Sequence, residues 1–65
     1  MELLNMDNLK ESNQNFIKNY LDEYGDIGRA NRLIEFFNRP DFPKDYGTLI
    51  LDGWLNEMNS IMWGD

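Results

Sequence analysis

The chain contains no cysteine and no histidine among its 65 residues. Without cysteine, no disulfide can form and no thiolate is available to bind a metal. Without histidine, the Ser-His-Asp and Cys-His arrangements of nucleophilic catalysis and the HExxH zinc motif are excluded. We therefore expect a protein that is not an enzyme and that uses no cofactor and no metal.

Long apolar segments are also missing from the sequence. No stretch approaches the roughly 18 consecutive apolar residues that a membrane-spanning helix requires. The opening residues, MELLNMDNLK, lack the basic and apolar regions of a secretory signal peptide. These absences predict a cytoplasmic protein that does not associate with a membrane.

Basic side chains are scarce. The chain has six lysines and arginines but twelve aspartates and glutamates, so the net charge is −6 and the isoelectric point is about 4.3. Four of the six basic residues lie in residues 29–44, and acidic residues predominate on both sides of that segment. Because an acidic surface repels phosphate, nucleic acid is a disfavoured partner and a larger protein with a basic surface is the expected one.

What the sequence does contain is enough apolar material for one small core. Hydrophobic residues make up 42% of the chain and aromatic residues 14%, which is too much for a disordered segment. The length allows a single domain. We expect residues 1–65 to form one all-α domain, a helix-turn-helix-like bundle of three or four helices.

Apolar residues at helical spacing predict a first helix over residues 13–24, with Ser12 as its N-cap. A start after Asp7 that includes Leu9 is the alternative. Gly25 is the expected stop, because glycine adopts positive φ without strain. A second helix should begin after the N-cap Asp26 and end by Arg39, since Pro40 excludes its predecessor from helical geometry.

A third helix is expected from Gly47 or Thr48 to Trp63, with Gly53 in its interior, packed closely against another helix. Residues 1–11 are either a fourth short helix or a loose arm, and Phe42 and Tyr46 should anchor the proline loop to the core. The predicted core consists of Phe16, Tyr20, Ile27, Leu33, Ile34, Phe37, Leu51, Trp54, Leu55 and Met58.

Two groups of residues are candidates for binding a partner. Asp22, Glu23 and Asp26 place three carboxylates within five residues around the first interhelical turn. They either dock on a basic partner or form ordinary solvated surface, with Asp26 acting only as a cap. Met62 and Trp63 are of the residue types that anchor protein interfaces, and they belong either to an interface or to the core.

Arg29, Arg32 and Arg39 form the only basic cluster. They are the candidate contacts of the alternative function, a small helical nucleic-acid-binding module. The competing interpretation is that these arginines pair with Asp22, Glu23 or Asp26 of the same chain, or are simply solvated.

Four short segments follow one another in an order that resembles the YozE-like domains: residues 16–21, Asp26-Ile27-Gly28, Asp41-Phe42-Pro43-Lys44 and Trp54-Leu55. The similarity covers about residues 14–57. YozE-like domains are short, uncharacterised helical proteins of Gram-positive bacteria and their phages, with a sterile-alpha-motif-like (SAM-like) fold. The resemblance implies a small helical bundle and no particular activity. The chain differs from the family in its N-terminal arm and in lacking a long C-terminal helix.

The leading hypothesis is a small acidic protein-binding protein. It would act as an inhibitor from a phage or mobile element, docking like a DNA mimic on a host protein that handles nucleic acid.

Overall fold

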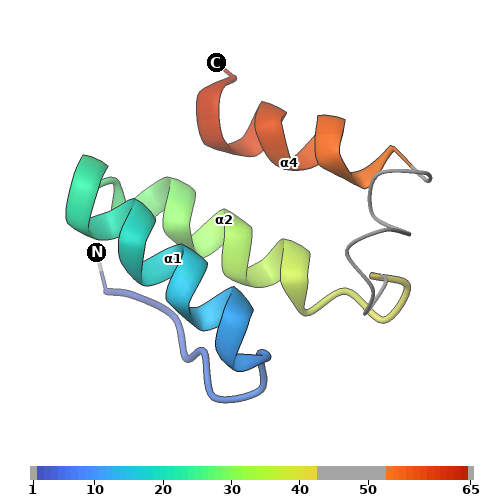
Figure 1. The fold of residues 1–65 in the computed structure, drawn as a ribbon, viewed down its shortest axis with the longest axis horizontal. Helices are drawn as coiled ribbons and strands as arrows, with labels where there is room; N and C mark the ends of the chain where they lie inside the picture. Colours follow the sequence, from blue (N-terminus) through green and yellow to red (C-terminus); the bar gives the residue numbers. More distant parts are fainter. Residues whose placement is uncertain (1, 43–52, 65) are drawn as a thin grey trace.

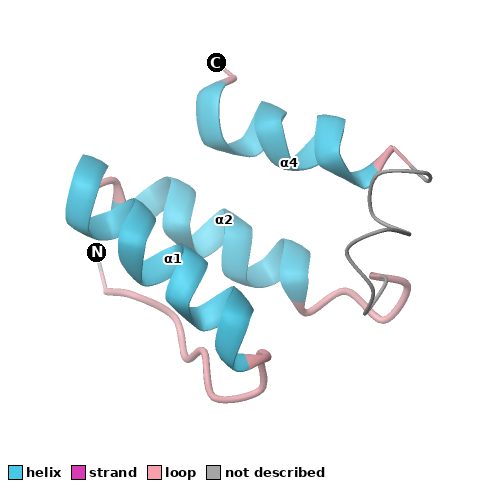
Figure 2. Cartoon of the chain, viewed as in Figure 1, coloured by secondary structure: helices cyan, strands magenta, loops and turns pink. Residues whose placement is uncertain are grey.

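The computed structural model describes residues 2–42 and 53–64, and these contain three α-helices and no strand. The helices are α1 (Glu11–Tyr24), α2 (Ile27–Phe37) and α4 (Trp54–Trp63) (Figures 1 and 2). The prediction of an all-α chain is thus confirmed for this part of the protein. The predictions for residues 43–52, which include the start of the third helix, Tyr46 and Leu51, lie outside the described residues.

Helix α2 contacts both other helices, and its two neighbours run in the opposite direction to it (Figure 1). The turn between α1 and α2 brings the C-terminal end of α1 next to the start of α2. The C-terminal end of α4 lies at this same end of the molecule. This arrangement is what positions the surface described below.

The turn between α1 and α2 follows the sequence prediction. Gly25 has φ of 67°, in the left-handed region, and its N–H donates to the Leu21 carbonyl oxygen at 2.8 Å. Asp26 caps α2, because its Oδ1 accepts from the Arg29 N–H at 3.0 Å. A stop and a start on adjacent residues let the chain reverse direction without a loop.

The start of α1 differs from the prediction. The helix begins at Glu11, so Ser12 is inside it, and the N-cap position is Lys10, which makes no side-chain capping bond. The reason is the anchored segment that precedes the helix: Leu9 is buried, and the Gln14 side chain donates to the Leu9 carbonyl oxygen at 2.9 Å. Tertiary burial of Leu9 therefore decides where α1 begins.

Residues 2–10 contain no helix. They form an arm, which is one of the two alternatives predicted from the sequence for residues 1–11. Asn31 of α2 holds the arm with both ends of its amide. It donates to the Glu2 carbonyl oxygen at 2.9 Å and accepts from the Leu4 N–H at 2.8 Å. Together with the buried Leu9, these bonds fix the arm along the helices.

Gly53 also differs from the prediction. It lies directly before α4 with φ of 78°, so it does not sit inside a helix. A Cβ added to it would meet no atom within 4 Å, which shows that close packing is not the reason for glycine at this position. Glycine is favoured there because other residues adopt positive φ only with strain.

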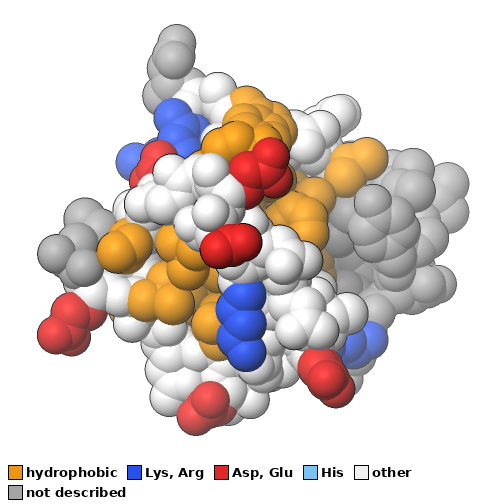
Figure 3. Space-filling view, turned by 60° about the vertical axis from the view of Figure 1, so that its left-hand side comes forward, with side chains coloured by type: hydrophobic (Ala, Val, Ile, Leu, Met, Phe, Trp, Pro, Cys, Tyr) orange, Lys and Arg blue, Asp and Glu red, His pale blue; other side chains and the backbone are white. Residues whose placement is uncertain are grey.

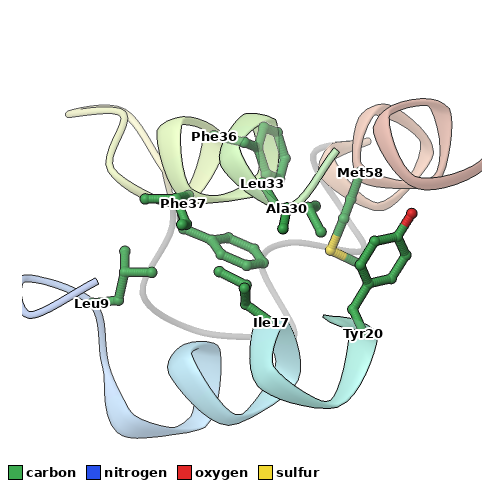
Figure 4. Close-up of a cluster of buried hydrophobic side chains, with 9 residues drawn as sticks. Leu9, Ile17, Tyr20, Ala30, Leu33, Phe36, Phe37 and Met58 are labelled. Carbon is green, nitrogen blue, oxygen red and sulfur yellow. The ribbon is translucent and has the colours of Figure 1, made fainter. Parts of the chain in front are cut away.

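The core lies where the three helices and the arm meet (Figure 4). Five predicted core residues are buried: Tyr20, Leu33, Ile34, Phe37 and Met58. Three others, Phe16, Trp54 and Leu55, are half-buried and pack against these. The remaining buried residues are Leu9, Ile17, Ala30 and Phe36.

Two core assignments show the effect of the tertiary arrangement. Ile27 was expected in the core and is 37% exposed, because it is the first residue of α2 and lies at the end of the bundle. Phe36 was not in the predicted stripe but is buried. Its ring contacts those of Phe42 and Trp54, since α2 is covered on more than one side.

Candidate protein-binding surface

Three aromatic rings meet at the end of the molecule where α1 and α4 both have their C-terminal ends. The Tyr24 ring centroid is 5.0 Å from that of Tyr20 and 5.0 Å from that of Trp63, and the Tyr20 and Trp63 centroids are 6.0 Å apart. Tyr20 is buried, whereas Tyr24 is 51% and Trp63 54% exposed. We call the exposed pair, Tyr24 and Trp63, the aromatic edge.

The position of the aromatic edge is set by hydrogen bonds to the end of α4. The Tyr20 hydroxyl donates to the Met62 carbonyl oxygen at 3.1 Å, and Arg29 Nη1 donates to the Ile61 carbonyl oxygen at 2.8 Å. The last carbonyls of a helix have no partner within the helix and carry partial negative charge. Side chains of α1 and α2 therefore satisfy them and hold Trp63 against Tyr24.

Asp26 keeps Arg29 in place. Its Oδ2 lies 3.3 Å from Arg29 Nε, while its Oδ1 caps α2. This predicted partner-binding residue is thus engaged within the fold, although its side chain stays 44% exposed. Its first role is to orient the arginine that binds the end of α4.

The environment of Tyr20 favours its neutral hydroxyl. Burial raises its pKa above the usual 10.0, and the negative charge of Asp26 raises it further, whereas the positive charge of Arg29 acts in the opposite direction. The protonated hydroxyl is the form that can donate to Met62. This hydrogen bond therefore persists throughout the neutral pH range.

Asp22 and Glu23 are exposed in the last turn of α1. Within the described part of the chain their carboxylates make no hydrogen bond and no ion pair, and the last turn holds no basic residue. Carboxylates are unfavourable at this end of a helix, where the macrodipole is negative. Their position gives α1 no electrostatic stabilisation and leaves both charges exposed. Glu23 lies about 100° around the helix from Tyr24, and Asp22 lies on nearly the opposite side.

The C-terminal apolar cluster divides between core and surface. Met58 is buried, Met62 is half-buried against the core, and Trp63 is mostly at the surface. Figure 3 turns this end of the molecule toward the viewer and shows hydrophobic side chains with acidic side chains beside them. Of the predicted apolar anchors, Trp63 is the exposed one.

The structure does not bring the three arginines to one surface. Arg29 binds the end of α4, as described above. Arg39 pairs with Asp41, with contacts of 3.0 and 3.2 Å, and with Glu57 near the start of α4 at 3.1 Å. Arg32 is exposed and makes no ion pair with the described residues. Of the predicted pairings, the structure contains that of Arg29 with Asp26. Arg39 pairs instead with Asp41 and Glu57.

Sequence reasoning missed two features of this region. Tyr24 was not among the predicted partner-binding residues, although it is 51% exposed beside Trp63. A groove of about 280 Å³ opens between the arm and the end of α2, beside Leu9, Phe37 and Phe42. It could not be foreseen, because the sequence leaves the path of the arm open. No group of three potential metal ligands occurs among the described residues.

No protein-family model, no curated protein and no solved structure matches this chain. The resemblance of residues 14–57 to the YozE-like domains stays a prediction. None of the helices in the described residues is long and apolar enough to cross a membrane.

Proposed function

We propose that this chain is a small acidic protein-binding protein. It docks on a basic surface of a larger protein through the aromatic edge and the carboxylates of Asp22 and Glu23. The observation that supports this most directly is Trp63, which is 54% exposed although Tyr20 and Arg29 hold the end of its helix in place. An exposed aromatic residue on a fixed backbone loses little conformational entropy on binding, and tryptophan and tyrosine are enriched among the residues that dominate interface energies.

Charge supports a basic partner. The chain carries a net charge of −6, and Asp22 and Glu23 face solvent without a cation from the described residues. Such a surface attracts a positively charged protein over about 10 Å at 0.1 M salt. It accelerates association and makes the rate dependent on salt.

The proposal extends to the kind of partner. An acidic helical body can occupy a surface that normally binds nucleic acid, in the manner of a DNA mimic. Inhibitors of this type suit a phage or a mobile element acting in the cytoplasm of its host. A SAM-like or helix-turn-helix-like bundle with a possible fourth helix belongs to the same proposal.

Among the described residues, no specific contact favours the alternative of a nucleic-acid-binding module. Arg29 and Arg39, two of its three proposed contacts, are held in ion pairs with carboxylates of the chain. The alternative is kept as an outcome of the test.

The test is affinity capture with the immobilised chain from a lysate of a Gram-positive bacterium, the source that the family resemblance implies. Association of the captured partner with the chain is then measured at two salt concentrations. The informative variant is Asp22→Lys with Glu23→Lys. The control is Glu2→Lys with Glu35→Lys, which changes the net charge by the same amount at exposed positions in the N-terminal arm and in α2.

We expect the first double variant to slow association and to flatten its salt dependence far more than the control does. Nucleic acid should compete with the wild-type chain for the partner. Equal effects of the two double variants would place the interface elsewhere. A chain that itself retards a labelled oligonucleotide, and loses this with Arg32→Ala, would replace the proposal with the alternative.

A further inference from the structure

We infer that the aromatic edge receives arginine side chains of the partner, so that the ligand is a guanidinium carried on a basic segment. This inference rests on the proposed function and names the chemistry that its site recognises. The evidence for it is a comparison between the surroundings of Trp54 and those of Trp63.

The chain already contains one arginine bound in this way. Arg39 Cζ lies 4.7 Å from the centroid of the Trp54 ring. The same guanidinium contacts both carboxylate oxygens of Asp41, at 3.0 and 3.2 Å, and Glu57 at 3.1 Å. An aromatic face and carboxylates at the edge of the guanidinium together satisfy its charge and its fork of N–H donors.

The surroundings of Trp63 share an aromatic face with this arrangement and have a carboxylate on the neighbouring helix. Tyr24, which contacts the Trp63 ring, follows Glu23 in the last turn of α1, and Glu23 lies about 100° around the helix from Tyr24, whereas Asp22 lies on nearly the opposite side. Among the described residues, the one cation–π contact is that of Arg39 with Trp54. Arg29, which binds the end of α4, is directed at Asp26 and the Ile61 carbonyl oxygen.

The ring geometry favours a guanidinium over a compact ammonium group. The centroids of Tyr20, Tyr24 and Trp63 are 5.0 to 6.0 Å apart, so the rings touch and leave no space between them for a cation. A ligand can use only the outer faces of the two exposed rings. A planar guanidinium stacks on such a face while its N–H groups reach carboxylates at the side, whereas a strongly hydrated ammonium gains less there.

The test compares three acetylated peptide amides of the same length, in which arginine, lysine or citrulline alternates with glycine. Each is titrated into the full chain. The indole N–H signals of Trp54 and Trp63 are followed by nuclear magnetic resonance and assigned with Trp63→Phe. The variants are Trp63→Ala and, as the control, Leu4→Ala, which removes another exposed apolar side chain.

We expect the arginine peptide to shift the Trp63 signal and to bind about 2- to 5-fold more tightly than the lysine peptide for each stacked side chain. The neutral citrulline peptide should bind least. Trp63→Ala should abolish the preference for arginine, Trp63→Phe should retain part of it, and Leu4→Ala should leave it unchanged.

Equal affinity for the arginine and lysine peptides, dependent on Asp22 and Glu23 but not on Trp63, would overturn this inference and leave acidic docking intact. A shift confined to Trp54 would also overturn it. If no peptide binds, arginine recognition is wrong, and the capture experiment decides the proposed function independently.

Discussion

Tyr20→Phe removes one hydroxyl and leaves the ring in place, so it isolates the hydrogen bond to the end of α4. That hydroxyl donates to the Met62 carbonyl oxygen at 3.1 Å from a side chain that is only 5% exposed. A neutral hydrogen bond of this kind contributes about 1 kcal/mol. For a domain of this size the expected fall in melting temperature is about 4–8 °C per kcal/mol.

The matched control is Tyr24→Phe. Its ring belongs to the same cluster, but the side chain is 51% exposed and its hydroxyl makes no hydrogen bond with the described residues. We expect this variant to melt within about 2–4 °C of the wild type, because surface changes away from specific contacts usually alter stability by no more than about 0.5 kcal/mol. Thermal unfolding followed by circular dichroism at pH 7 compares the two variants. Equal melting temperatures for Tyr20→Phe and Tyr24→Phe would refute the role given to the Tyr20 hydroxyl.

Tyr20→Phe also tests how the stability of the fold depends on pH. Folding raises the pKa of Tyr20 above 10.0, first through burial and then through Asp26. The folded state therefore favours the protonated hydroxyl. Its contribution to stability is complete below pH 10 and falls as the pH rises through the folded pKa. Urea unfolding between pH 8 and pH 11 should show a steeper loss of stability for the wild type than for Tyr20→Phe, and parallel curves would contradict this assignment.

Three further substitutions test the fold. Gly25→Ala places a Cβ at a φ of 67° and should cost about 1–2 kcal/mol in urea unfolding; no change would mean that the turn adopts another conformation. Asp26→Ala should cost about 1 kcal/mol for the cap alone, and Asp26→Asn, which keeps the cap, should recover most of this in the same assay. Trp54→Ala removes the ring between Phe36, Phe42 and Arg39 and should cost up to about 3–5 kcal/mol, whereas Trp63→Ala should cost much less; similar melting temperatures for these two variants would place Trp54 outside the core.

The sequence alone predicted those features that depend on interactions between neighbouring residues. Gly25 and Asp26 mark a helix end and a helix start through backbone φ and a side chain that reaches an N–H three residues away. The helical spacing of Leu33, Ile34 and Phe37 likewise predicts a buried face of α2. The all-α class followed from such signals.

The signals failed where distant residues compete with local preference. Ser12 is a good capping residue, but the burial of Leu9 and its bond to Gln14 start the helix earlier. Gly53 fits a helical pattern by spacing, yet its φ of 78° is incompatible with the interior of a helix. Helical spacing shows which residues share a face and does not show where the backbone leaves the helix.

By itself, the sequence determined the all-helical class, the turn between α1 and α2, and the acidic charge of the molecule. Only the tertiary structure decided that Trp63 lies at the surface beside Tyr24 and that Arg29 is directed at Asp26 and the end of α4. Long side chains such as arginine can reach many partners, and the exposure of an aromatic ring depends on what packs over it. The partners of Arg29 and the exposure of Trp63 are decided by contacts between residues far apart in the chain. The spacing of residues along the sequence does not show these contacts.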